Sequence, residues 1–282
     1  MHGPVVVEVN PSHTVARVSI PLAGKGSDSV SNAALDTLRN TILPATVGTV
    51  QGATYAVTGP TAQSADENAL LKQKAPIVFG FVLVFAFILL LVSFRSIVIA
   101  VKAILLNLLS VGAAYGVLVA VFQWGWGESF LGFHSNGGIA SWLPIFMFVI
   151  LFGLSMDYHV FILSRVREAY DRGLKTEDAV AHGISTTAGV VSSAALVMVG
   201  VFAVFALMPI LDMKEMGIGL AAAVLIDATI VRAVLLPATM KLLGEKNWYL
   251  PRWLEWLPRL EHDSSPPTER APDAAPAAAL GA

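Results

Sequence analysis

The pattern of hydrophobic and polar positions changes near residue 75. Before it, apolar and polar residues alternate over 5–9 and 14–20, which predicts two strands of a hairpin, because successive side chains point to opposite faces of a strand. Helical periodicity over 29–43 predicts a helix, and the short run at 54–57 predicts a third strand. We therefore expect residues 1–74 to form a partial α+β domain, part of a split βαβ unit.

Beyond residue 75 the chain contains five long apolar runs. A run of about 20 apolar residues can cross the hydrocarbon core of a bilayer. The runs predict a polytopic α-helical membrane protein with helices at about 77–92, 97–122, 142–163, 186–207 and 218–242. This bundle covers 75–244. Tryptophan and arginine predict an interfacial segment at 245–260, and serine, proline and alanine predict a disordered cytoplasmic tail at 261–282.

Positive charge is confined to alternate loops. Arginine and lysine follow the first, third and fifth runs, whereas the loops at 123–141 and 208–217 contain a single such residue, Lys214. By the positive-inside rule, the C-terminus is cytoplasmic and residues 1–74 lie outside. An exported N-terminal domain without a signal peptide or preceding helix leads us to expect the back portion of a longer protein.

Composition supports a membrane protein and excludes several functions. The 282 residues are 55% hydrophobic and 13% charged, with a mean hydropathy of +0.69. There is no basic face for nucleic acid, and the absence of cysteine excludes disulfides, thiol catalysis and cysteine-ligated metals. We expect neither an enzyme nor a cofactor or metal site.

The third run contains ionisable residues in its interior. An aspartate at the centre of a membrane costs about 3 kcal/mol on insertion scales, so Asp157 is expected to face a bundle interior or water. Tyr158 projects about 100° away and can border the same seam between helices. We predict that Asp157 and Tyr158 form a proton relay, because such a carboxyl could take up a proton from one side and release it to the other. His159 is expected to be an ordinary, hydrogen-bonded polar residue.

Further polar residues lie in the fourth and fifth runs. Asp227 and Arg232 predict an ion pair or structural polar network, which Ser192 and Ser193 could join. Alternatively, these hydroxyls bond the carbonyls of their own helix. Small residues four apart, Gly112 and Gly116, predict a close helix–helix contact in the second run.

The segment at 153–173, GLSMDYHVFILSRVREAYDRG, resembles the signature of the MMPL family of the RND transporter superfamily. The residues that fill the pattern are Gly153, Asp157, Tyr158, Ser164, Arg165 and Glu168. Similar segments occur at 57–68, 94–119 and 225–244.

This resemblance implies an exporter of lipids or other hydrophobic molecules in the bacterial cytoplasmic (inner) membrane, with the proton gradient as its energy source. Family members have two similar halves, each with one helix, an extracytoplasmic porter domain and five more helices, and each half supplies one Asp-Tyr pair. This chain resembles the C-terminal half and contains one pair, Asp157 and Tyr158. The implied partners are membrane lipids, a hydrophobic substrate, and a missing N-terminal half or a second chain. The alternatives are a non-transporting lipid- or partner-binding module, similar to sterol-sensing bundles, and an inactive truncated transporter.

Overall fold

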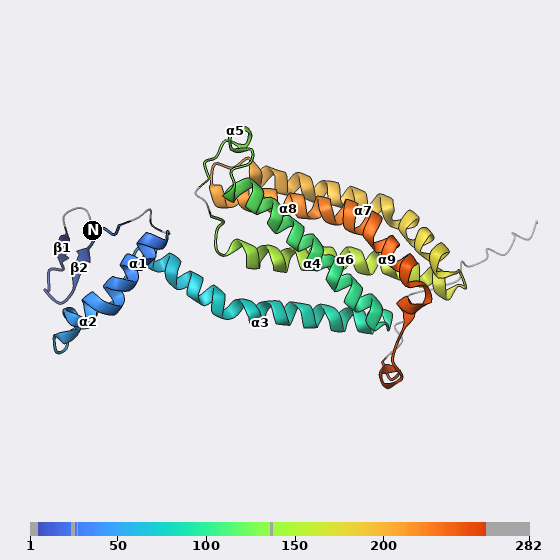
Figure 1. Ribbon diagram of the computed structural model, residues 1–282, viewed down its shortest axis with the longest axis horizontal. Coiled ribbons are helices and arrows are strands. Elements are labelled where there is room, and N and C mark those ends of the chain that lie inside the picture. Colours follow the sequence, from blue (N-terminus) through green and yellow to red (C-terminus); the bar gives the residue numbers. More distant parts are fainter. Residues whose placement is uncertain (1–4, 24–25, 27, 136–137, 258–282) are drawn as a thin grey trace, which may run out of the picture. The chain divides into compact units, whose positions relative to one another are not determined.

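The structure is a computed structural model that describes residues 5–23, 26, 28–135 and 138–257. The chain divides into two compact units, Met1–Phe79 and a second that begins at Gly80 (Figure 1). The predicted boundary between residues 74 and 75 falls inside helix α3 (Pro60–Phe94). The predicted disordered tail at 261–282 lies outside the described residues.

The first unit opens with a β-hairpin. Strands β1 (Val6–Val9) and β2 (Ala16–Ser19) pair antiparallel, with Val6 opposite Ser19. The turn is closed by Asn10, whose Oδ1 accepts hydrogen bonds of 2.9 Å from the backbone N–H groups of Thr14 and Val15. The predicted hairpin is therefore present.

A helical segment follows the hairpin. Helix α1 (Ser29–Thr37) is capped by Asp28, whose carboxylate accepts from the Ser31 N–H at 2.8 Å. The chain continues through the π-helical turn η1 (Leu38–Ile42), α2 (Leu43–Ala45) and η2 (Val47–Thr49). The predicted third strand at 54–57 is wrong: these residues pair with no strand in the described part of the chain, and a strand is stabilised only by pairing. A porter-like domain stays a prediction.

In the described part of the chain, five helices are long and apolar enough to cross a membrane, and this confirms the predicted polytopic helical fold. Three of them are single α-helices, namely α3, α6 (Leu143–Asp171) and α7 (Thr176–Ala206). The other two are composite: α4 (Ile97–Leu118) with η3 (Val119–Gln123), and α8 (Leu211–Ile226) with η4 (Asp227–Leu235) and α9 (Leu236–Leu243). Short elements are α5 (Glu128–Leu131), η5 (Gly244–Trp248) and η6 (Arg252–Leu254).

In the second unit α7 packs along both α6 and α8, and α4 packs against α8 (Figure 1). Glycine permits the closest approaches: a Cβ on Gly183 would lie 2.8 Å from the Val166 backbone nitrogen, and one on Gly217 would lie 2.6 Å from that of Ala206. The contact predicted at Gly112 and Gly116 is not formed within the described residues, where a Cβ at either position would meet no atom of another helix within 4 Å.

At both ends of this unit, polar side chains connect separate segments of the chain. At one end, Lys214 is buried and its ammonium donates to the Leu131 carbonyl at 2.5 Å, while Glu215 accepts from the Ala140 N–H at 2.9 Å. At the other end, Glu245 accepts hydrogen bonds of 2.7 Å from Tyr170 and Thr176. We call this second end, formed by the α6–α7 turn and η5, the basic end.

Candidate functional site

Three consecutive polar residues in the middle of α6 point in three directions. Because neighbouring helical residues project about 100° apart, each of the three can face a different environment. Asp157 is exposed, Tyr158 is half-buried and His159 is completely buried. The sequence predicts that Asp157 faces a bundle interior or water. In the described residues, α6 turns that side chain away from the interior of this bundle and buries His159.

The exposed carboxylate lies on a continuous exposed face of α6. Residues at helical spacing form this face, namely Phe146, Val149, Gly153 and Asp157. The other three of these residues are apolar. Asp157 is thus the ionisable residue among these exposed positions of α6.

Arg232 is the centre of a buried polar cluster on the other side of α6. Its guanidinium forms an ion pair with Asp227, and both side chains are more than nine-tenths buried. It also donates 3.0 Å hydrogen bonds to the backbone carbonyl and the hydroxyl of Ser155. The guanidinium carbon lies 4.5 Å from the centroid of the Tyr158 ring, a cation–π contact.

A π-helical segment makes this ion pair geometrically feasible. In an α-helix, residues five apart project about 140° from each other, so Asp227 and Arg232 would point away from one another. The segment η4 is wound with i→i+5 hydrogen bonds, for example from the Leu236 N–H to the Val231 carbonyl. Such winding places residues five apart on nearly the same face, and π-helical turns occur often at functional sites.

Two further residues extend the cluster across the bundle. Ser155 donates its hydroxyl hydrogen to the Asn107 side-chain carbonyl, which links α6 to α4. The His159 Nδ1 lies 3.2 Å from the Ser155 carbonyl. We call Asn107, Ser155, His159, Asp227 and Arg232 the polar core.

The polar core has unused hydrogen-bonding capacity. Among the described residues, five of its buried polar atoms have no partner: Asn107 Nδ2, His159 Nε2, Asp227 Oδ1, and Arg232 Nε and Nη1. A small cavity of about 20 Å³ borders the cluster; it is lined by Asn107, Ser155, Asp227 and Arg232, together with Tyr158 and apolar side chains of α4, α6, α7 and α8. Buried polar groups are normally satisfied by protein or by ordered water.

Ser192 and Ser193 do not join the polar core. Both are exposed on α7, and the Ser193 hydroxyl donates to the Val190 carbonyl of its own helix at 3.0 Å. The alternative interpretation of Ser193 as a self-bonded helical serine is therefore the one that the structure supports. The prediction from sequence thus included two serines outside the network and omitted Asn107, Ser155 and His159.

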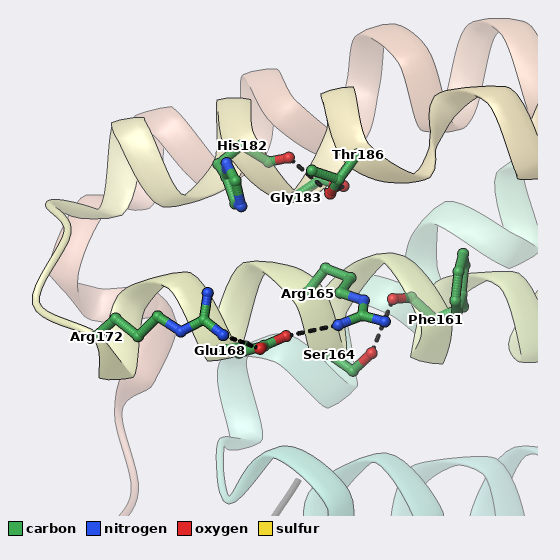
Figure 2. A network of polar contacts seen from close by, with 8 residues as sticks. All are labelled: Phe161, Ser164, Arg165, Glu168, Arg172, His182, Gly183 and Thr186. Atoms are coloured by element: carbon green, nitrogen blue, oxygen red, sulfur yellow. Dashed lines mark hydrogen bonds and ion pairs between the residues drawn. The ribbon is translucent and has the colours of Figure 1, made fainter. Parts of the chain in front are cut away.

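The C-terminal residues of the MMPL-like signature, Ser164, Arg165 and Glu168, lie in a polar network at the basic end of α6 (Figure 2). Glu168 accepts hydrogen bonds from Arg165, at 2.9 Å, and from Arg172. Ser164 donates to the Phe161 carbonyl at 2.8 Å, and on α7 the Thr186 hydroxyl donates to the His182 carbonyl at 2.9 Å. Arg165 and Glu168 of the signature are thus direct partners.

Comparison with known proteins identifies the family. The MMPL family model matches residues 8–264. The chain is 44% identical over 252 residues to the mycolic acid-containing lipids exporter MmpL11 of Mycolicibacterium smegmatis, covering 89% of this chain and 26% of that protein. It is 45% identical over 228 residues to the heme uptake protein MmpL11 of Mycobacterium tuberculosis, covering 80% and 23%, respectively. It is 36% identical over 203 residues to the trehalose monomycolate exporter MmpL3 of Mycobacterium tuberculosis, covering 72% and 21%. The chain spans about a quarter of the length of these relatives, and it belongs to the MMPL family.

Proposed function

We propose that the chain forms part of a proton-driven exporter of lipids or other hydrophobic molecules, in which Asp157 and Tyr158 carry the proton. Two of the relatives are named as lipid exporters, which supports this class of substrate. The observation that carries the proposal is the position of Asp157, exposed in the middle of a helix long enough to span a membrane.

An exposed carboxylate at that depth requires a polar environment. Facing lipid, it would cost about 3 kcal/mol or more, so a second protein surface or water must cover it. In the proposed assembly, a second half, or a second chain, covers the exposed face of α6. Its own ionisable pair then lies opposite Asp157, and the proton moves between the two halves. This chain matches only about a quarter of the length of these relatives, which agrees with such a partner.

Tyr158 connects the exposed carboxylate to the polar core. It follows Asp157 directly, and its ring lies over the Arg232 guanidinium. In the proposed relay, a change of charge at Asp157 acts on Tyr158, whose ring contacts a buried cation. The polar core positions Tyr158, and its unpaired atoms and cavity give water a place to enter beside the relay.

The proposed membrane is the bacterial cytoplasmic (inner) membrane, with the first unit outside and the basic end in the cytoplasm. The distribution of positive charge supports this orientation. Lys214, the one cation in the opposite loops, is buried and bonded to backbone carbonyls, so it serves the fold there.

Replacement of Asp157 by asparagine tests the proposed function. Asparagine keeps the shape and much of the hydrogen bonding but cannot titrate. In cells that naturally produce the chain, Asp157→Asn at the native locus should abolish transfer of newly made, isotope-labelled lipid to the cell surface. The amount of the chain in the membrane should not change. Asp178→Asn, which removes an exposed carboxylate from the first turn of α7, is the matched control and should export normally.

Normal export by the Asp157→Asn variant would refute the relay. Asp157 would then be a packing residue, and a non-transporting lipid- or partner-binding module would explain the bundle better.

A further inference from the structure

Lys102 is a buried cation that the proposed relay does not use. It lies on α4 at the basic end, and its side chain is more than nine-tenths buried. Its ammonium donates one hydrogen bond, of 3.2 Å, to the Asn247 side-chain carbonyl. Since α4 begins at Ile97 and rises 1.5 Å per residue, Lys102 lies about 8 Å along the helix from its end.

Asn247 is held rigidly as the partner of Lys102. Its side-chain amide donates to the Met240 and Gly244 carbonyls, both at 2.7 Å, and its backbone carbonyl accepts from the Ser96 hydroxyl at 2.5 Å. With both amide hydrogens used, its carbonyl oxygen is fixed toward Lys102. Ser96, Lys102 and Asn247 thus form a prebuilt polar site.

This site has a positive charge without a negative counterpart. Lys102 forms no ion pair with any carboxylate in the described part of the chain, and Asn247 is neutral. An ammonium in an apolar setting is costly unless it is paired with an anion. Lys102 can donate two more hydrogen bonds. The site therefore lacks an anionic acceptor.

Lys102 lies in the wall of an apolar groove. It has a volume of about 560 Å³ and runs between α4 and α9, with walls that include Val101, Leu105, Leu242 and Leu243. Leu105 and Leu242 are exposed, so the groove is accessible from the membrane. Its size is within the range of small-molecule sites, and its lining is almost entirely hydrocarbon.

A second hollow continues the groove toward the interface. Val98 borders both, and the second hollow is lined by Lys246, Trp248, Tyr249 and Glu245. Tryptophan, tyrosine and lysine are typical of the headgroup level of a bilayer. Glu245 is already an acceptor for Tyr170 and Thr176, so its charge is partly engaged elsewhere.

We propose that this groove binds one anionic phospholipid, whose phosphate accepts hydrogen bonds from Lys102 and whose acyl chain lies between α4 and α9. The arrangement of surfaces matches such a molecule: a hollow with interfacial aromatic residues and Lys246 leads into a hydrocarbon groove that has Lys102 in its wall. The site lies apart from Asp157 in sequence and lining, and it does not depend on the proposed export.

The test uses the purified full chain and a fluorescent phosphatidylglycerol as the probe. In phosphatidylcholine nanodiscs, the chain should bind this lipid about tenfold or more tightly than an equally labelled phosphatidylcholine, because a hydrogen-bonded charge is gained. Lys102→Gln, which keeps a donor for Asn247 but removes the charge, should abolish that preference. Lys102→Arg should retain most of it. Lys241→Gln, on the neighbouring helix and paired with Glu177 outside the groove, is the matched control and should bind normally.

Two further measurements test the site without relying on the Lys102 variants. Leu105→Trp should weaken binding by filling the groove, and soluble glycerol phosphate should fail to displace the lipid. Equal binding of both lipids by the unmodified chain would overturn the proposal, as would unchanged preference in Lys102→Gln. Efficient displacement by glycerol phosphate would contradict a lipid and assign the site to a soluble anion.

Discussion

The ion pair between Asp227 and Arg232 gives the sharpest prediction about stability. Arg232 is the residue that joins η4 to α6, through Ser155 and the ring of Tyr158. Arg232→Met removes the cation and leaves the Asp227 carboxylate buried without its partner. Removing one partner of a buried ion pair destabilises a protein by about 3–5 kcal/mol. Loss of the cation–π contact adds about 1–2 kcal/mol.

The double variant Asp227→Leu/Arg232→Met should recover most of that loss. Replacement of a whole buried pair by apolar residues of similar size is often neutral. The coupling between the two positions, obtained from the double-mutant cycle, should therefore be several kcal/mol. The control is Lys241→Met, which breaks an ion pair of 3.5 Å whose side chains are 69% and 61% exposed, and which should cost no more than about 1 kcal/mol.

The assay is equilibrium unfolding of the full chain in mixed detergent micelles, followed by tryptophan fluorescence. An Arg232→Met variant no less stable than Lys241→Met would refute the reasoning, because Asp227 would then not be buried against its partner. A double variant as unstable as the single one would show that the pair itself, rather than an uncompensated charge, supplies the stability.

Two other stability predictions and one on topology follow from specific contacts. Gly183→Ala should lower the unfolding free energy by about 1–3 kcal/mol, because the new Cβ would lie 2.8 Å from the Val166 nitrogen, whereas Gly112→Ala should be neutral; equal effects in thermal unfolding would contradict this packing. Tyr158→Leu should cost about 1–2 kcal/mol and Tyr158→Phe much less, since phenylalanine keeps a ring over Arg232; similar losses in both would argue against the cation–π contact. Asp178→Cys should resist a membrane-impermeant thiol reagent added to intact cells while Trp126→Cys is labelled, and the reverse pattern would overturn the proposed orientation.

Hydropathy predicted the five spans because the cost of polar groups in hydrocarbon dominates their sequence pattern. It did not predict helix ends, since helices continue into water: α3 begins at Pro60 rather than at 77, and α7 at Thr176 rather than at 186. The prediction of a third strand at 54–57 was wrong because sequence pattern alone does not define a pairing partner. A short strand pattern indicates only that residues can pair, and the pairing depends on a neighbour that sequence does not specify.

The site was predictable in its residue types but not in its geometry. Asp157, Tyr158, Asp227 and Arg232 stand out as costly groups in apolar runs. Which of them meet depends on helix rotation and on the π-helical winding of η4, and neither follows from α-helical spacing. Asn107 was visible as a polar residue inside the second run, although its contact with Ser155 depends on how α4 packs beside α6.

Proton movement through the assembled transporter tests the central claim most directly. Inverted membrane vesicles from cells that naturally produce the chain can be loaded with a pH-sensitive dye and given an imposed proton gradient. Gradient dissipation that depends on the chain should vanish in Asp157→Asn and persist in Asp178→Asn, with equal amounts of protein in both membranes. Undiminished, chain-dependent proton flux in the Asp157→Asn vesicles would contradict the assignment of Asp157 as the proton carrier.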